Sequence, residues 1–564
     1  MRKKIVTLIL IAVMAVTLIG CVEVQPEPNP DADPVTLTVY SQLANYSGEM
    51  VGWFAQELLE RFNVIINIVP DADGVYETRM NEQNLGDIVV WGADGADYKT
   101  AVDAGLLFDW EEDNILQEYG PYIWEHMQPA LQKNARISSD TDTIYGFGHN
   151  VASSSDDHES FFYTWDLRWD LYKALGYPEV NDLDDFMQLM IDMKEANPLD
   201  ENGDPTYAAS LWPDWDGNMV MYVKSMATAY YGYDELELGL YDTENGTFHG
   251  ALEQGGPYLE MLSWFNQLYR NGLLDPDSAT QNFDEMTAKV VSGGTFFSIF
   301  NFAGSSAYNT QTHIDQNKIM LSFKPDEATP IAYGMNVMGG SRVWSIGAKS
   351  QYPELCMEII NWLCTPEGRM TMEYGPEDVT WYYGEDNKTY ATDLGRDMHY
   401  DQDTEFPAES GYVGKFGDGD FEINNTTWSL DVVNPVSGER YNWDYWASNQ
   451  TEARNAIEAD WRSVTGATTI QDYLDAGDYK VAVGTEYSAS SRSDELDIKW
   501  NQVTNAIVDY SWLAIYATSQ AQFNFIVNDM INAANDYGYA DCLAWCIAEA
   551  AARHALELAI TNPQ

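Results

Sequence analysis

Basic residues are scarce in this sequence. Its 564 residues contain 29 lysines and arginines against 89 aspartates and glutamates, which gives a formal net charge of −60 at pH 7. A surface this acidic repels the phosphates of nucleic acids and anionic lipid headgroups, so both are poor general partners. We interpret the acidic excess as a strongly solvated exterior and not as a specific binding feature.

Cysteine is also rare, with 5 residues: Cys21, Cys356, Cys364, Cys542 and Cys546. None belongs to a CxxC pair or lies near a histidine at zinc-finger spacing. Cys542 and Cys546 are four residues apart in a helical pattern, which is a poor geometry for a disulfide. We therefore expect the last four cysteines to be small residues of a hydrophobic core.

Catalytic signatures are missing as well. The sequence has no GxSxG or HExxH motif, and its 7 histidines are scattered. A glycoside hydrolase needs only two carboxylates at a set distance, and 89 acidic residues always supply candidates. We predict that the protein is not an enzyme and needs no cofactor.

Apolar and aromatic residues are abundant. The chain is 45% hydrophobic and 21% charged, which is typical of a globular protein. Because single cores stop growing near about 250 to 300 residues, we expect at least two cores. Aromatic residues make up 13% of the chain, including 19 tryptophans and 36 tyrosines. This is more aromatic surface than cores need, so part of it is expected to line a ligand cleft.

The N-terminus has the pattern of an export signal. A basic "MRKK" precedes an apolar run, residues 5–19, that is too short for a convincing membrane span. The run ends in "LIGC", which resembles the bacterial lipobox. We predict a signal peptide over residues 1–20, lipidation (palmitate) of Cys21 and a Pro-rich, acidic tether over residues 21–35. The alternative is an ordinary signal peptide followed by a chance cysteine.

The first half of the chain alternates strands and helices. "VTLTVYS", "VIINIV" and "GDIVVWGADG" read as strands, and "GEMVGWFAQELLERFN" between the first two has one apolar helical stripe. This order implies a parallel sheet with crossover helices. Ligands of such sheets bind at the carboxyl ends of the strands, so Trp91 and Asp94 are expected to face one.

A second unit begins after "DTIYGFGHN". Two helices joined at "GYPEVND" follow, the second capped by Asn181 or Asp182, and "TFFSIFNFAG" reads as a buried strand. "MNVMGGSRVWSIG" is the expected return through a hinge, and Thr365 and Pro366 open a later helix. A loop-rich region follows residue 390, and a helix is expected from about Asp494 to the end.

These segments in this order resemble the extracellular solute-binding proteins of bacterial ABC importers, specifically the large carbohydrate-associated lipoproteins. The resemblance is carried by "LIGC", "IYGFGHN", "LRWDLYKALGYPEVNDLDDFMQLMIDMKEANPLDENGDPTY" and "PELCMEIINWLCTPEGRMTMEYGPEDVTWYY". It covers most of residues 36–390, whereas the C-terminal third is similar only loosely.

The resemblance implies an α/β fold of the two-lobe, type II-like periplasmic-binding-protein kind, with a hinge and a helical C-terminal extension. The expected divisions are lobe 1 in residues 36–150, lobe 2 in 151–330, a return to lobe 1 in 331–390, and a C-terminal part in 391–564 that packs on the lobes. The implied function is capture of a sugar or oligosaccharide between the lobes and delivery to an ABC permease. We expect a lipid-anchored monomer on the outer face of the cytoplasmic membrane.

Sugar sites combine an aromatic platform for the apolar ring face with planar polar groups for the hydroxyl rim. The loop "WPDWDGN" offers both and is the best candidate, although packing of its tryptophans on the lobe is an equal alternative. Packing or a hinge role is the favoured alternative for three further candidates, Asn301, Trp344 and Trp381. The predicted ligand-binding residues are Trp91, Asp94, Trp212, Asp214, Trp215, Asp216, Asn218, Asn301, Trp344 and Trp381.

The stretch "DENGDPT" is half of a calcium loop. Oxygen ligands are available from Asp200, Asn202, Asp204 and Thr206, but the sixth position is Pro205 and the twelfth is Leu211 instead of glutamate. The alternatives are a weak structural calcium site and a plain Asx turn.

Three other functions stay open. They are an exported polysaccharide-active enzyme, a lipoprotein that adheres to insoluble glycan, and a binding protein of the same family whose cargo is a peptide or another small solute.

Overall fold

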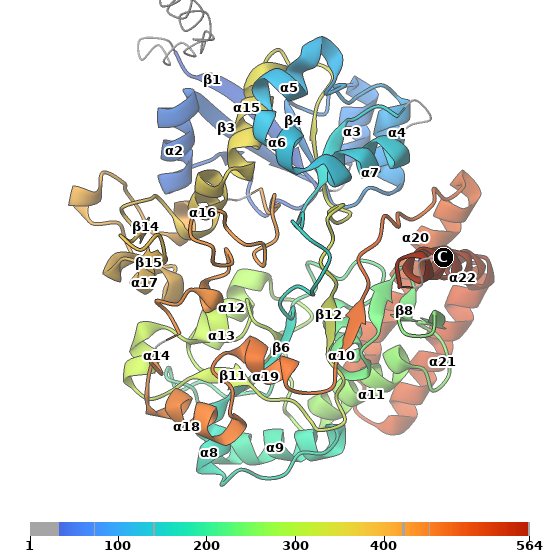
Figure 1. Ribbon diagram of the computed structural model, residues 1–564. Coiled ribbons are helices and arrows are strands. Elements are labelled where there is room, and N and C mark those ends of the chain that lie inside the picture. Colours follow the sequence, from blue (N-terminus) through green and yellow to red (C-terminus); the bar gives the residue numbers. More distant parts are fainter. Residues whose placement is uncertain (1–32, 73, 139–141, 420–422, 451, 562–564) are drawn as a thin grey trace, which may run out of the picture.

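The computed structural model describes residues 33–72, 74–138, 142–419, 423–450 and 452–561. The predicted signal peptide, Cys21 and nearly all of the predicted tether lie outside these residues. Among the described helices, none combines the length and the apolar character needed to cross a membrane. Two lobes are stacked in Figure 1, with the C-terminal part along their sides.

Lobe 1 is built on one six-stranded sheet. The strand order is β2-β3-β1-β4-β13-β5, in which β1 is parallel to β3 and β4, while β13 runs antiparallel to β4 and β5. The parallel core confirms the expectation from the alternating strands and helices. The strands are β1 (Val35–Ser41), β2 (Gly48–Glu49), β3 (Val64–Pro70), β4 (Ile88–Trp91), β5 (Gly146–Gly148) and β13 (Val343–Ile346).

Helices cover this sheet, as the upper part of Figure 1 shows. Thr365 accepts a hydrogen bond from the backbone NH of Gly368, and Pro366 is the first residue of its helix, as predicted. The helices are α2 (Gly52–Phe62), α3 (Val75–Glu82), α4 (Ala96–Asp103), α5 (Ile115–Tyr119), α6 (Pro121–His126), α7 (Gln128–Ser138), α15 (Pro353–Cys364) and α16 (Pro366–Tyr374).

Lobe 2 surrounds a small antiparallel sheet of order β10-β6-β11. Asp182 caps its helix by accepting from the NH groups of Asp184 and Asp185, so Asp182 is the cap between the two residues considered. The sheet strands are β6 (Tyr163–Arg168), β10 (Phe297–Phe300) and β11 (Met320–Ser322). A separate hairpin sheet contains β7 (Asp234–Leu236), β8 (Gly239–Asp242) and β9 (Thr247–Gly250). The helices are α8 (Trp169–Ala174), α9 (Leu183–Ala196), α10 (Met221–Tyr231), α11 (Pro257–Arg270), α12 (Phe283–Val291), α13 (Ser305–Tyr308) and α14 (Gln311–Asp315).

The C-terminal part divides between the two lobes. Trp381, Trp428 and Trp446 belong to the core of lobe 1, whereas Trp461 and Trp500 belong to the core of lobe 2. A parallel pair, β12 (Ile331–Tyr333) and β16 (Lys480–Ala482), ties this part to the segment that returns from lobe 2. Its other elements are β14 (Trp381–Tyr383), β15 (Thr389–Ala391), α17 (Asp393–Tyr400), α18 (Ala456–Thr465) and α19 (Ile470–Asp475).

The last segment is not one helix, as the sequence led us to expect, but three: α20 (Asp494–Ile515), α21 (Gln520–Asp536) and α22 (Tyr539–Thr561). Ser519 caps α21 through its side chain, and Gly538 has a φ of 101°, a value that favours glycine. The two breaks let all three helices fold back on lobe 2, at the right of Figure 1. Cys356, Cys364, Cys542 and Cys546 are free and buried, as predicted.

Candidate ligand-binding cleft

A cleft of about 1900 Å³ lies between the lobes. Lobe 1 contributes residues 93–97, lobe 2 contributes residues 234–237, and the C-terminal part contributes residues 442–444. Typical small-molecule pockets are about 300 to 1,000 Å³, so this cleft has room for an extended ligand.

The carboxyl end of β4 places polar groups on the lobe 1 wall. Asp94 follows β4, lines the cleft and is buried; its carboxylate lies 3.3 Å from Lys133 Nζ of α7. Lys133 also donates to the carbonyl oxygen of Gly340 at 3.2 Å. Beside them, the backbone NH of His149 donates to the carbonyl oxygen of Arg342 at 2.8 Å, next to the β5–β13 pair. These residues lie where ligands of such sheets bind.

Several buried polar atoms of the wall make no hydrogen bond within the described residues. Asn425 is 2% exposed, yet both its Nδ2 and its Oδ1 lack a partner there. His149 Nδ1 and Asn449 Oδ1 are in the same situation. Burying such atoms without a partner costs free energy, so their hydrogen-bonding capacity is available to a ligand.

Aromatic rings line the cleft from two parts of the chain. In lobe 2, the ring of Phe162 is 50% exposed and lies 6.1 Å from that of Phe302, which also lines the wall. In the C-terminal part, the Trp443 indole stacks on the imidazole of His399 at 4.1 Å with planes 10° apart. Burial and the nearby Arg454 lower the pKa of His399 to about 3, so the stacked imidazole is neutral.

A carboxyl group of the wall is protonated at neutral pH. Burial, together with the nearby Asp431 carboxylate, raises the pKa of Glu159 to about 8. Asp431 itself accepts hydrogen bonds from the NH and hydroxyl of Ser160 at 2.6 and 2.7 Å. A protonated Glu159 can donate a hydrogen bond to a ligand hydroxyl as well as accept one.

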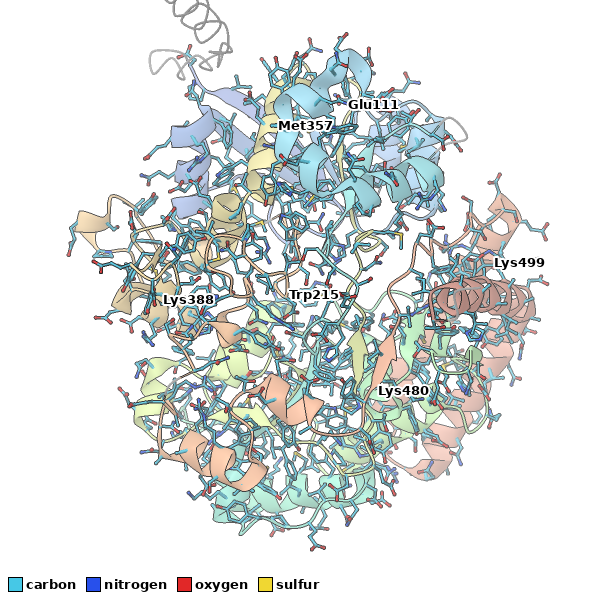
Figure 2. All side chains as sticks on the ribbon, in the orientation of Figure 1. Glu111, Trp215, Met357, Lys388, Lys480 and Lys499 are labelled. Atoms are coloured by element: carbon cyan, nitrogen blue, oxygen red, sulfur yellow. The ribbon has the colours of Figure 1, made fainter. Side chains whose placement is uncertain are left out.

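The tryptophans of the predicted loop "WPDWDGN" do not line the cleft. Trp212 is 1% exposed in the core of lobe 2, and Trp215 packs on Phe283 with ring centres 4.8 Å apart. Figure 2 shows Trp215 on the side of lobe 2 that faces lobe 1. Asp216 is buried and accepts a hydrogen bond from Trp512 Nε1 of α20 at 2.6 Å. The loop is therefore a packing element, the alternative considered for its tryptophans.

The two other polar residues of this loop, Asp214 and Asn218, differ in their position relative to the cleft wall. Asp214 is exposed off the wall and accepts from the NH of Phe283 at 3.3 Å. Asn218 lines the cleft, but its Oδ1 accepts from Trp500 Nε1 at 3.1 Å. Asn301 also lines the cleft and is exposed.

The remaining predicted tryptophans are fully buried away from the wall. Trp91 belongs to a small core in lobe 1. Trp344 donates its Nε1 hydrogen to the carbonyl oxygen of Thr426 at 2.9 Å, and Trp381 donates to that of Gly375 at 2.7 Å. Trp91 is the last residue of β4 and points into the core, whereas Asp94, three residues later, reaches the cleft.

The calcium-like loop is closed by its own hydrogen bonds. One Asp200 oxygen accepts from the NH groups of Asn202 and Asp204 at 2.9 and 2.8 Å, and the other accepts from Ser292 Oγ at 2.6 Å. Thr206 is buried and donates to the carbonyl oxygen of Asn197. The described residues include no group of three His, Cys, Asp or Glu arranged for a metal ion. The geometry is that of an Asx turn, and calcium binding stays a prediction.

The wall residues that the sequence reasoning missed include Phe162, Arg342, Asn425 and Trp443. Only Phe162 had a local signal, as a second aromatic residue in the "FFYTW" run before β6. The others come from segments without periodicity, and their role depends on neighbours far away in the chain.

The two lobes, the crossing segments and the cleft between them define the class: the chain has the fold of the solute-binding proteins of ABC transporters. The fold of FusA of S. pneumoniae, solved in complex with kestose, matches with a TM-score of 0.58 at 15% identity, over 92% of this chain and 99% of FusA. The alginate-binding protein AlgQ2, solved without calcium ion, matches with a TM-score of 0.60 at 14% identity, over 93% and 98%. The N-glycan transport solute-binding protein NgtS of Streptococcus pneumoniae matches with 0.53 at 14% identity, over 94% and 100%.

Sequence comparison finds a curated relative that covers less of this chain than the solved structures do. Lipoprotein LipO of Bacillus subtilis (strain 168) is 23% identical over 298 residues, which are 52% of this chain and 55% of LipO. The alignment thus spans about half the length of that relative. No protein-family model matches the chain. The predicted resemblance is confirmed at the level of the fold, which extends over the helical C-terminal part.

Proposed function

We propose that the protein is a solute-binding protein that captures an oligosaccharide between its lobes and delivers it to an ABC permease. The observation that carries this proposal is Asn425, a buried cleft residue whose amide has both its donor and its acceptor unused. A sugar hydroxyl both donates and accepts a hydrogen bond, so a ring bearing hydroxyls matches this amide.

The aromatic surface of the cleft supports the same ligand class. A sugar ring has an apolar C–H face, and the half-exposed Phe162 offers a flat apolar surface for it, while Trp443 borders the same cleft. The relatives point the same way, since FusA was solved with kestose, AlgQ2 is described as alginate-binding and NgtS as an N-glycan transporter component. All of them are binding proteins, which supports a non-enzymatic role.

The arrangement of the cleft also supports a closed, ligand-bound form that a permease would recognise. Lobe 1 supplies Asp94, lobe 2 supplies Phe162 and the C-terminal part supplies Trp443, so a ligand that touches all three gains contacts as the lobes close. A ligand shifts the balance between open and closed forms only by such a difference in contacts.

Membrane anchoring belongs to this proposal through Cys21 and the lipobox-like motif. The relative LipO is named a lipoprotein, which supports attachment on the outer face of the membrane. Mass spectrometry of the membrane fraction from the native host tests it: the expected N-terminal peptide begins at a lipid-modified Cys21, and Cys21→Ser releases the protein.

A melting screen tests the binding function. Because ligand binds the folded state, stability rises by about 2.7 kcal/mol at a ligand concentration of 100 Kd, and the melting temperature rises with it. The panel contains mono- and oligosaccharides, peptides and insoluble glycan. Each bound ligand is recovered, and its mass is measured by mass spectrometry. We expect an oligosaccharide to bind and to return intact. Cleaved sugar would identify an enzyme, a shift with peptides alone another cargo, and retention on insoluble glycan alone an adhesion protein.

A further inference from the structure

Arg342 lines the cleft without a counter-charge. It lies directly before β13 and is half-buried. Its backbone oxygen accepts from His149, but within the described residues its guanidinium forms no ion pair and no hydrogen bond. Burial lowers its pKa, and no charged group of the described residues opposes that effect.

This isolation sets Arg342 apart from the other lysines and arginines of the described cleft wall. The other basic residues of the wall each form an ion pair with an aspartate or glutamate: Lys133, Arg369, Arg454, Arg462, Arg492 and Arg553. The sequence has about three acidic residues for each basic one, 89 against 29, so a counter-charge is easily supplied. A half-buried guanidinium with no counter-charge among the described residues is a favourable partner for an anion that enters the cleft.

Two positive charges act on His149 next to Arg342. His149 is half-buried, and desolvation together with the positive charges of Arg342 and Lys133 lowers its pKa to about 3. The histidine therefore stays neutral, and its unused Nδ1 lies on the same wall. Asp94, a carboxylate on the lobe 1 side of this wall, is paired with Lys133.

We propose that the oligosaccharide is acidic and that Arg342 binds its anionic group, a uronate carboxylate or a sulfate ester. This inference rests on the proposed function, since it names the chemical class of the solute bound in the same cleft. The planar guanidinium binds two oxygens of such a group at once, which makes the contact strong and directional. A neutral analogue leaves the guanidinium without an anionic partner, so the site binds it more weakly.

Matched ligands test the charge requirement. Uronate oligosaccharides are compared with their methyl esters, which have the same rings and no charge, and with sulfated neutral oligosaccharides of the same length. Calorimetry on the wild-type protein is expected to show at least tenfold tighter binding of the acid than of the ester. The sulfated arm identifies which anionic group is preferred.

Two Arg342 variants and one control variant test whether the preference for the acid over the ester depends on Arg342. Arg342→Gln is expected to reduce the acid-to-ester ratio to near one, whereas Arg342→Lys keeps part of it. Arg136→Gln is the charge-matched control, because Arg136 pairs with Glu486 and is not part of the wall; it leaves the ratio unchanged. Ligand-free Arg342→Gln is expected to melt no lower than wild type, since the guanidinium has no ion pair or hydrogen bond among the described residues to lose.

The possible failures are distinct. Equal binding of acid and ester by the wild type overturns the inference and leaves the proposed function standing. A loss of affinity in Arg342→Gln that is the same for acid and ester also overturns it. Arg342 would then act independently of the ligand charge, by pairing with a carboxylate of the protein when the lobes close. Absence of binding by every carbohydrate, charged or neutral, overturns the proposed function and the inference together.

Discussion

The indole NH of Trp512 donates a 2.6 Å hydrogen bond to the carboxylate of Asp216. This contact joins the loop of residues 212–218 in lobe 2 to α20 of the C-terminal part. Asn218 makes a second such contact with Trp500 of the same helix at 3.1 Å. The loop that looked most like a sugar site is thus where the C-terminal helices dock on lobe 2.

The first prediction concerns this docking contact and pH. Burial raises the pKa of Asp216 from 3.8 to about 6, more than the hydrogen bonds from Met221 and Trp512 lower it. Between these two values the folded state binds more protons than the unfolded state, so this residue makes stability fall as pH rises from about 4 to about 6. Above that range its effect is constant.

Asp216→Asn removes this dependence. The expected difference in unfolding free energy between variant and wild type changes by about 3 kcal/mol from pH 4 to pH 7, at about 1.4 kcal/mol per pKa unit. Urea unfolding at several pH values measures it. Parallel pH profiles for the two proteins would show that Asp216 has an ordinary pKa in the folded state.

A second prediction separates packing from ligand binding in the same loop. Trp212 is 1% exposed among the rings of Tyr222 and Phe283, so Trp212→Ala leaves a large cavity and lowers the unfolding free energy by about 3–5 kcal/mol. Trp215→Ala, at a partly buried position, costs less. Calorimetry below the melting temperature is expected to give unchanged ligand affinity for both variants. A selective loss of affinity in either one would return the loop to the ligand site.

Local patterns predicted the elements of the fold well. The strand at Val35–Ser41, the cap at Asp182 and the helix start at Thr365 and Pro366 each follow from a few neighbouring residues. The order of these elements, with the family resemblance, was enough for the two-lobe architecture. The helical C-terminal region was predicted correctly, but the breaks at Ser519 and Gly538 that divide it into three helices were not.

The cleft could not be predicted in the same way. The side chains of Asn425 and Arg342 stand out because they have no hydrogen bond or ion pair with the described residues, and such a lack is visible only in the folded chain. Trp91 and Trp344 have the residue type of a sugar platform, yet the pleat of β4 and β13 turns them into the core. Composition therefore indicated an aromatic cleft without identifying its rings.

A third prediction concerns the calcium-like loop. Because Asp200 already accepts hydrogen bonds from Asn202, Asp204 and Ser292, we expect the melting temperature to be the same with and without a chelator. Asp200→Ala removes these bonds and is expected to lower stability by about 1–3 kcal/mol, equally in calcium and in chelator. A midpoint that falls on chelation in the wild type, but not in Asp200→Ala, would establish a calcium site.

The last prediction compares two buried asparagines, Asn134 of lobe 1 and Asn425 of the cleft wall. Asn134 is satisfied, since it donates to Tyr98 at 2.7 Å and accepts from the NH groups of Tyr145 and Gly146. Asn134→Ala is therefore expected to lower stability by about 1–3 kcal/mol through the partners it leaves unpaired. The Asn425 side chain makes no hydrogen bond with the described residues, so Asn425→Ala is expected to leave the ligand-free melting temperature unchanged or raised.

Ligand affinity is expected to change in Asn425→Ala and to stay the same in Asn134→Ala, the reverse of the effects on stability. Asn425→Ala removes a donor and an acceptor that only a ligand uses, so it is expected to weaken binding of the captured solute by roughly tenfold or more. Asn134 is not part of the cleft wall, and Asn134→Ala should bind as the wild type does at temperatures where it is folded. Unfolding curves and calorimetry on both variants supply the two readouts. If Asn425→Ala loses stability and keeps its affinity, the amide has a partner within the protein, and the buried polar wall is not a binding surface.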